Sequence, residues 1–336
     1  MANIKDVARL AGVSPSTVSR VVAGSSRISP ETQARVREAM MALNYYPNAN
    51  ARSLVRRATN AVGVIIARPA EQAFANPFFP EVLRGIGAEL HRHGYDLVLT
   101  MTTTPEEEHA ACLRLLKQRR VDGVILTSSR VHDALLEELV AGEYPFVLIG
   151  RAGEGQPVSW VNNDNVAVGE MAVEHLVGRG HQRIALINGP EELTVSLDRR
   201  QGFRQAMARY KLDLPSEYEV EGEFTKDGGY RAMVRLLTLP QPPTAVFCAD
   251  DAMAVGALMV LKERGLTRQV ALIGVNDDPL TALLDPPLST VRIPVFDLGS
   301  TAARLLLDGL QHGVTGPRQV VLPSQLVVRE STNWTL

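Results

Sequence analysis

The sequence of 336 residues contains only two cysteines, Cys112 and Cys248, which lie far apart along the chain. This number excludes a disulfide framework and a cysteine-rich metal site, and a reducing cytoplasm is the simplest location for such a chain. No apolar run approaches the roughly 20 residues that a membrane-spanning helix requires. The first residues also lack the apolar core of a secretory signal. We therefore expect a cytoplasmic protein with no membrane partner.

The sequence also lacks the short motifs of common enzyme classes. It contains no phosphate-binding P-loop, no GxSxG nucleophile motif and no HExxH metal motif. His91 and His93 lie two positions apart in a predicted helix, so they point in different directions and make a poor metal-binding pair. Asp250 and Asp251 are adjacent, and neighbours in sequence seldom face one reacting group. We predict no catalytic residue, no metal site, no cofactor and no enzymatic activity.

Positive charge is concentrated at the N-terminus. Residues 1–60 contain nine Lys or Arg and three Asp or Glu, which gives this segment a net charge of +6. The whole chain has a net charge of −2, so the remaining residues carry −8. A basic segment attached to an acidic body is typical of a nucleic-acid-binding module. Charge alone also allows a second interpretation, in which the basic face is simply exposed to solvent.

Residues 1–47 contain repeated signals for helix starts and ends. Asn3 can cap a first helix, and Gly12 stands where a C-terminal glycine normally ends one. Ser14-Pro15 and Ser29-Pro30 each combine an N-cap serine with a proline at the first helical position, where the missing N–H costs nothing. A helix, a tight turn, a short helix and a longer bracing helix make up the plan of a helix-turn-helix domain.

The second predicted helix carries side chains that we expect to contact DNA. Small polar groups and one arginine near a helix N-terminus suit the major groove, because arginine can donate two hydrogen bonds to guanine O6 and N7. A three-helix bundle that binds only protein is the alternative interpretation. The predicted DNA-binding residues of this segment are Ser14, Pro15, Ser16, Thr17, Ser19 and Arg20.

From residue 61 onward, short apolar segments alternate with amphipathic ones. The predicted strands are 61–67, 95–101, 123–127, 146–150, 183–188, 245–249, 270–275 and 325–329, with helices such as 80–93, 105–119, 166–178 and 251–263. Strands rich in Val, Ile and Leu that are separated by helices predict parallel sheets covered on both faces. This alternation of strands and helices occurs twice, in 61–162 and in 163–289. It therefore predicts two doubly wound lobes with a ligand-binding crevice at their strand carboxyl ends.

Several N-terminal motifs occur together in one order. They are DVA (6–8), AGVS (11–14), TVSRV (17–21), LNYYPN (43–48) and ARSL (51–54). They resemble the N-terminal signature of the lactose repressor/galactose repressor family of bacterial transcription regulators, and weaker similarity extends to about Arg329. The resemblance implies an all-α helix-turn-helix domain followed by an α/β domain of the periplasmic-binding-protein type. It also implies three crossings between the lobes, which we place near Asn162, Thr290 and Val321.

The resemblance and the motifs together predict the domain boundaries. They are a helix-turn-helix domain at 1–47, a hinge or linker at 48–60 and an effector-binding and dimerisation domain at 61–336. Lobe 1 is expected at about 61–162 and 290–321, and lobe 2 at about 163–289 and 322–336. In the family, the segment matching 49–55 is a hinge helix that orders on operator DNA.

The hinge resemblance implies further contacts to DNA. The residue matching Leu54 enters the minor groove in the family, where an apolar wedge unstacks base steps and bends the duplex. The DNA-binding residues implied here are Asn48, Ala51, Arg52 and Leu54. A plain linker is the alternative interpretation of this segment.

Polar residues that follow strands or begin helices are candidates for the effector site. By resemblance, Asp164, Arg199, Asp250 and Asn276 match the family's main effector-contacting positions, and Phe78 and Phe224 match aromatic positions around the ligand. Carboxylates, amides and arginine can each engage paired hydroxyls, while an aromatic face stacks on the apolar side of a pyranose. The alternative is that several of these residues are helix caps, turn residues or core residues.

We predict a transcription regulator, acting as a repressor of carbohydrate-utilisation genes. Segments 49–54 and 76–86 are similar to maltose-type regulators, which makes maltose or a related glucoside the predicted effector. The alternatives are a purine- or nucleoside-responsive repressor and a sugar-binding protein without a regulatory role. One helix-turn-helix unit reads too few base pairs for high specificity, so we expect a homodimer on palindromic operator DNA. The sequence does not indicate whether a phosphocarrier protein takes part.

Overall fold

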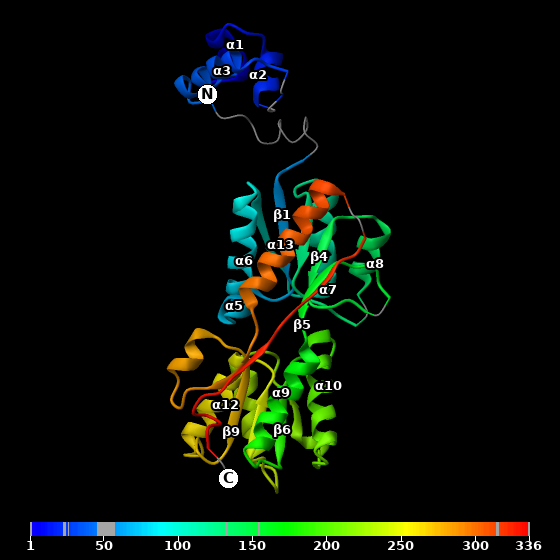
Figure 1. The fold of residues 1–336 in the computed structure, drawn as a ribbon, viewed down its shortest axis with the longest axis vertical. Coiled ribbons are helices and arrows are strands. Elements are labelled where there is room, and N and C mark those ends of the chain that lie inside the picture. The colour runs from blue at the N-terminus through cyan, green and yellow to red at the C-terminus, as the bar shows by residue number, and fades with distance from the viewer. Residues whose placement is uncertain are drawn as a thin grey trace.

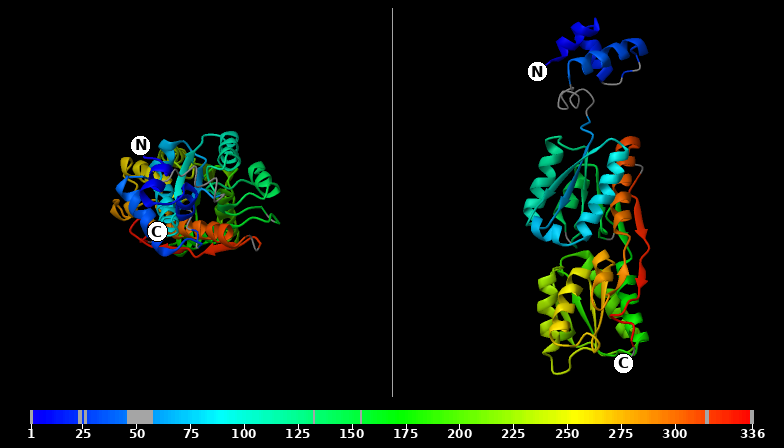
Figure 2. Two further views of the ribbon diagram at one scale, coloured as in Figure 1. Left: turned by 90° about the horizontal axis from the view of Figure 1, so that it is seen from above. Right: turned by 90° about the vertical axis from the view of Figure 1, so that its left-hand side faces the viewer.

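The computed structural model describes residues 2–22, 25, 27–45, 58–131, 133–153, 155–313 and 316–334. Figure 1 shows a group of N-terminal helices at one end, a first lobe in the middle and a second lobe at the other end. Figure 2 shows the two lobes stacked along the long axis, with the C-terminal strands running beside both. Within the described ranges, no helix is both long and apolar enough to cross a membrane.

The N-terminal part, which we call the head, forms the predicted bundle of helices. Its described helices are α1 (Ile4–Ala11), α2 (Pro15–Val22) and α3 (Pro30–Ala42). Val7, Val18 and Val36, one from each helix, are completely buried and form the centre of the head's own small core. The predicted helix-turn-helix order is therefore confirmed.

Local capping explains where these helices begin and end. The Asn3 side chain accepts hydrogen bonds from the backbone N–H groups of Lys5 (2.8 Å) and Asp6 (3.3 Å). Gly12 follows α1 at φ +65°, a left-handed conformation that glycine adopts without steric cost. Ser29 Oγ accepts a hydrogen bond from the Thr32 N–H at 3.4 Å. The predicted caps at Asn3, Gly12 and Ser29 are thus confirmed.

Each lobe is built on one sheet. The first sheet contains β1 (Ala61–Ile66), β2 (Asp96–Met101), β3 (Gly123–Leu126), β4 (Phe146–Ile149), β5 (Trp160–Asn163) and β11 (Gln319–Leu322), in the order β11-β5-β4-β3-β1-β2. Its neighbouring strands are all parallel within the described part. The second contains β6 (Ile184–Asn188), β7 (Glu219–Glu221), β8 (Ala245–Cys248), β9 (Ala271–Asn276), β10 (Ser289–Arg292) and β12 (Gln325–Val327), in the order β12-β10-β9-β8-β6-β7. There β12 runs antiparallel to β10, and the other pairs are parallel.

Helices cover both faces of each sheet. The first lobe has α5 (Ala70–Ala75), α6 (Phe78–Arg92), α7 (Pro105–Lys117), α8 (Ala134–Ala141) and α13 (Val295–His312). The second has α9 (Asn165–Gly178), α10 (Thr194–Arg209), α11 (Lys226–Leu237) and α12 (Asp251–Glu263), with the short 3-10 helices η1 (Ser216–Tyr218) and η2 (Pro279–Leu283). Every residue of β1, β3, β6 and β8 is buried, which explains their continuous apolar sequences. The predicted α/β architecture of two doubly wound lobes is confirmed.

The chain passes between the lobes three times in the described part. It leaves the first sheet after β5, returns to the first lobe with α13 after β10, and leaves again after β11. The expected crossing positions, Asn162, Thr290 and Val321, lie within β5, β10 and β11 respectively. These short connections make the strand carboxyl ends of the two sheets face each other (Figure 2).

Candidate functional site

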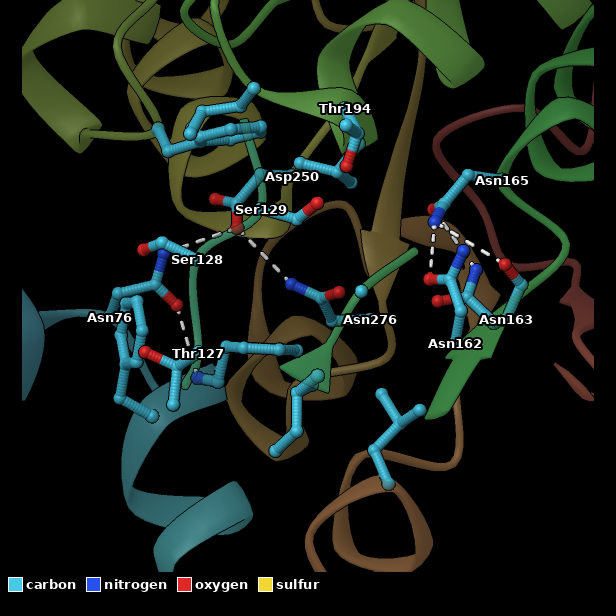
Figure 3. Close-up of a pocket in the computed structure, with 18 of the residues that line it drawn as sticks. Asn76, Thr127, Ser128, Ser129, Asn162, Asn163, Asn165, Thr194, Asp250 and Asn276 are labelled. Carbon is cyan, nitrogen blue, oxygen red and sulfur yellow. Dashed lines mark hydrogen bonds between the residues drawn. The ribbon is translucent and has the colours of Figure 1, made fainter. Parts of the chain in front are cut away.

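A cavity of about 110 Å³ lies between the lobes (Figure 3). Thr127 follows β3, Gly150 follows β4, Asp250 follows β8, and Asn276 ends β9. The cavity therefore opens at the strand carboxyl ends, the usual ligand-binding edge of doubly wound sheets. Its lining residues are Arg68, Asn76, Phe78, Phe79, Thr127, Ser128, Ser129, Ile149, Gly150, Asn162, Asn163, Asn165, Leu193, Thr194, Val195, Arg199, Phe224, Asp250, Asn276 and Leu298.

The Asp250 carboxylate connects the two lobes at this cavity. Its Oδ1 caps α12 by accepting hydrogen bonds from the N–H groups of Ala252 (2.7 Å) and Met253 (3.3 Å). Its Oδ2 accepts from Nδ2 of Asn76 in the first lobe and Nδ2 of Asn276 in the second, each at 3.1 Å (Figure 3). Burial raises the pKa of Asp250, while the hydrogen bond from Asn76 and the positive charge of Arg199 oppose that shift.

Arg199 is buried in α10 with its guanidinium at the cavity. Its Nε donates to Asn165 Oδ1 at 2.9 Å, and its Nη1 donates to the Ala249 carbonyl. Burial lowers the pKa of Arg199 to about 10, although nearby aspartates including Asp250 act in the opposite direction. The group therefore stays protonated at neutral pH. Asn165 also donates from Nδ2 to Asn162 Oδ1 at 3.0 Å, so a fixed amide network supports the arginine (Figure 3).

Arg68 and Phe224 form a second part of the lining. Arg68 belongs to the first lobe, and its Nη1 donates to the Glu223 carbonyl of the second lobe at 3.3 Å. Its Cζ lies 5.5 Å from the centre of the Phe224 ring, within the range of a cation–π contact. Desolvation by burial lowers the pKa of Arg68, and the charge of Asp250 opposes the change. The wall thus offers an aromatic face beside a guanidinium.

Direct contacts also hold the lobes together beside the cavity. The Thr194 N–H of the second lobe donates to the Ser129 carbonyl of the first at 3.0 Å. Arg151 Nε donates to Asp198 Oδ2 at 2.7 Å, and Asp198 is buried in α10. Together with the Asn76–Asp250 hydrogen bond, these contacts bring the two lobes onto opposite sides of one small polar space.

The structure brings together most of the predicted effector residues. Phe78, Arg199, Phe224, Asp250 and Asn276 line the cavity, although they come from separate regions of the sequence. Their contact with an effector stays a prediction.

Asp164 is the predicted site residue that the structure places elsewhere. Its side chain is exposed, and Oδ1 caps α9 by accepting from the Ala167 N–H at 2.9 Å. Asn162, Asn163 and Asn165 line the cavity instead. Capping alone does not explain the difference, since Asp250 caps α12 and still lines the cavity, whereas the Asp164 side chain is exposed to solvent. The structure therefore places Asp164 outside the lining of this cavity, and its contact with an effector stays a prediction.

Sequence reasoning missed several other lining residues. Thr127, Ser128 and Ser129 follow a buried strand, which is the same signal that singled out Asp250. Arg68 carried none, because a lone arginine after a strand is ordinarily a surface residue.

The predicted DNA-reading segment lies at the surface of the head. Ser14, Pro15, Ser16 and Arg20 are exposed, whereas Thr17 and Ser19 are half-buried. Ser14 Oγ accepts from the Thr17 N–H at 3.2 Å and lies 2.8 Å from Ser16 Oγ, so it caps α2 as predicted. The hinge residues named above, Asn48, Ala51, Arg52 and Leu54, lie outside the described residues.

Comparison with known proteins matches both parts of the chain to protein families. Residues 3–48 match the model of bacterial regulatory proteins of the lacI family, and residues 173–332 match a periplasmic binding protein-like domain. The ribose operon repressor of Escherichia coli (strain K12) is 38% identical over 322 residues, which covers 94% of each chain.

Two solved structures extend the comparison. A complex of the transcriptional regulator CelR with cellobiose has a TM-score of 0.77 and 34% identity, covering 98% of this chain and 100% of that one. The lac repressor dimer bound to operator and the anti-inducer ONPF has a TM-score of 0.87 and 29% identity, covering 98% and 99% respectively. The chain is therefore a member of the LacI family of bacterial transcription regulators, with a helix-turn-helix domain and a periplasmic-binding-protein-like domain.

Proposed function

We propose that this protein represses carbohydrate-utilisation genes and that a small sugar in the interlobe cavity controls its operator affinity. Maltose or a related glucoside is the effector that we put forward. The relatives support a sugar, because one is named for the ribose operon and another was solved with cellobiose. Both are named as regulators rather than enzymes, and we assign this chain no catalytic step.

The observation that carries the proposal is the polar set around Asp250. Asp250 accepts hydrogen bonds from Asn76 and Asn276, while Arg199 is fixed nearby. A sugar hydroxyl is both donor and acceptor, so it can replace an amide at the carboxylate and still satisfy the amide. Phe78 and Phe224 add apolar surface for the face of a pyranose.

The same geometry suggests how sugar binding reaches the DNA. A ligand that takes over the Asn76–Asp250 contact would interact with both lobes at once and change how closely they approach. We propose that this change alters the position of the hinge at 48–60, where Asn48, Ala51, Arg52 and Leu54 would contact operator DNA. The division into a 1–47 head, this hinge and a 61–336 effector domain is part of the proposal.

We also propose a homodimer on a pseudo-palindromic operator. A single head exposes one short recognition helix, α2, with Ser14, Pro15, Ser16 and Arg20 at its surface. Such a unit reads only a few base pairs, and a two-fold dimer doubles the site. The lac repressor structure that resembles this chain is a dimer bound to operator, which supports the arrangement.

The test begins with selection of duplexes from a randomised pool by the purified chain. The enriched duplex is then used in fluorescence anisotropy with maltose, cellobiose, ribose, adenosine or hypoxanthine. We expect a symmetric duplex to be enriched and a glucoside to change its affinity at least fivefold, the lower end of ordinary allosteric coupling. A response to nucleosides or purines alone would overturn the sugar proposal. Failure to enrich any duplex would overturn the regulatory one.

A further inference from the structure

Arg119 and Arg120 lie beside the point where the linker enters the first lobe. The Asp122 carboxylate accepts hydrogen bonds from the backbone N–H groups of Thr59 (2.6 Å) and Asn60 (2.8 Å), which immediately precede β1. Asp122 itself precedes β3, and Arg119 and Arg120 come just before it. Because β3 pairs in parallel with β1, the residues before both strands lie at one edge of the sheet. That edge faces the head (Figure 1).

Both guanidinium groups are unpaired among the described residues. Arg119 and Arg120 are exposed, and no described group bonds to either side chain. Their backbone is nevertheless fixed, since their N–H groups donate to the carbonyls of Leu116 (2.9 Å) and Leu115 (2.9 Å). A well-ordered turn therefore presents two neighbouring positive charges to solvent.

The other charged side chains near this end of the sheet are either bonded to a partner or acidic. Arg92 is the last residue of α6, which precedes β2, and its Nη1 lies 2.7 Å from the buried Glu89 carboxylate. Lys117 lies 3.1 Å from Glu138. Asp122 is occupied by Thr59 and Asn60. Two exposed acids near this end are Asp96, the first residue of β2, and Glu143, in the turn before β4.

The length of the linker limits how far DNA can be from these arginines. Twelve residues separate Tyr45, at the end of the head, from Ala58. At full extension this segment reaches about 45 Å, and any more compact form brings the head closer. A duplex carries about one negative charge per 1.7 Å of its axis, so a duplex held by the head presents many phosphates toward this edge.

We propose that Arg119 and Arg120 form a second DNA-contacting surface, in which the first lobe binds backbone phosphates flanking the operator. The inference rests on the proposed DNA-binding function and adds a sequence-independent contact from the effector domain. Such contacts fix the position and orientation of a protein on DNA without reading bases. They also give the two-lobed domain a contact with the duplex that is separate from the contact made by α2.

The experiment compares two double variants of the full chain. Arg119→Gln/Arg120→Gln removes the proposed contact. Arg264→Gln/Arg268→Gln is the matched control, since it removes two exposed arginines before β9, at the edge of the second sheet away from the cavity. Fluorescence anisotropy measures binding to the duplex enriched by the wild type, at salt concentrations from about 50 to 200 mM. Thermal unfolding checks that each variant keeps the wild-type midpoint.

The salt dependence gives the decisive readout. Each phosphate contact contributes about 0.9 to the slope of log affinity against log salt, and the proposed homodimer carries Arg119 and Arg120 twice, so the variant should lose about 3.6 from that slope. The affinity ratio of wild type to variant should then fall about 150-fold between 50 and 200 mM salt. The control should keep the wild-type slope. An unchanged slope, or an equal loss in both variants, would overturn this inference while leaving operator binding intact. If the wild type enriches no duplex, the proposed function fails and this inference fails with it.

Discussion

Two aspartates, Asp250 and Asp164, have the same local role as helix caps but differ in their position relative to the cavity. Asp250 caps α12 and Asp164 caps α9, and each follows a strand. Only Asp250 lines the cavity, where its second oxygen accepts from Asn76 and Asn276. The pair therefore offers an internal control, because loss of either carboxylate removes one helix cap.

Asp250→Ala should weaken sugar binding about 10- to 150-fold, because hydrogen bonds to a charged group contribute about 1.5–3 kcal/mol. Asp164→Ala should leave sugar affinity at the wild-type value. Each substitution should also cost about 1 kcal/mol of stability through the lost cap. Isothermal titration calorimetry with the sugar that changes duplex affinity in the anisotropy assay measures the affinities, and urea unfolding measures the stabilities. Similar losses of affinity in both variants would show that the cavity is not the binding site.

The same two residues show how far sequence reasoning could go at this scale. An acid between a strand and a helix predicts a position near the crevice, and this held for Asp250. The pattern cannot say which way a cap residue's free oxygen points, since that depends on partners far away in sequence. Asn76 lies 174 positions from Asp250, so their hydrogen bond was not predictable from local patterns.

His181 makes the second lobe sensitive to acid. Burial, with a smaller contribution from His175, lowers the pKa of His181 to about 4. The unfolded chain has a histidine pKa of about 6.5, so the folded state favours the neutral ring. The contribution of the neutral His181 ring to the free energy of unfolding is fully present above pH 6.5. It is lost as the pH falls from 6.5 toward 4, by up to about 1.4 kcal/mol per pH unit.

Urea unfolding at several pH values tests this expectation. His181→Gln should flatten the decline in the free energy of unfolding between pH 6.5 and 4, relative to the wild type. His91→Gln is the control, because His91 is exposed at the end of α6. The role of His181 is refuted if the two variants show the same pH profile.

At the scale of elements, glycines determine how closely paired helices approach. A Cβ on Gly85 of α6 would lie 2.1 Å from the Phe296 carbonyl oxygen of α13, and one on Gly299 of α13 would lie 2.2 Å from the Val82 oxygen of α6. The two backbones are thus in direct contact. This packing attaches α13, which follows the second lobe in sequence, to the first lobe.

Gly85→Ala should destabilise the protein by about 1–3 kcal/mol, the usual cost of overpacking, despite the better helix propensity of alanine. Gly87→Ala lies on the same helix, but its Cβ would meet no atom within 4 Å. It should stabilise the protein by about 0.5–1 kcal/mol. The free energy of urea unfolding measures both. Equal effects of the two substitutions would rule out the close helix contact as the cause.

Strands were predictable where they are buried and continuous. AVGVII in β1 and IALIN in β6 are buried throughout, and both were predicted within one or two residues of their bounds. β5 (WVNN) and β11 (QVVL) were not, because β5 contains only two apolar residues and β11 alternates between exposed and half-buried positions. Their place in the sheet depends on pairing with each other, which local composition does not reveal.

At the scale of the whole molecule, the third lobe crossing came from the family resemblance rather than from periodicity. A doubly wound pattern predicts two lobes, but β11 and β12 join them through residues more than 100 positions from the first crossing. The result is a cavity whose walls belong to both lobes, at the opposite end of the first sheet from the linker that leads to the head. Because one ligand in this cavity would contact both lobes, we propose that it changes how the head binds DNA.

The most direct test measures sugar affinity by calorimetry with and without saturating amounts of the selected operator duplex. Coupling between two sites is reciprocal, so the duplex should change the sugar dissociation constant by the same factor by which the sugar changes duplex affinity. We expect that common factor to lie between about 5 and 150. The same sugar affinity in both conditions would contradict the proposed coupling between sugar and DNA binding, because the cavity would then have no influence on the head.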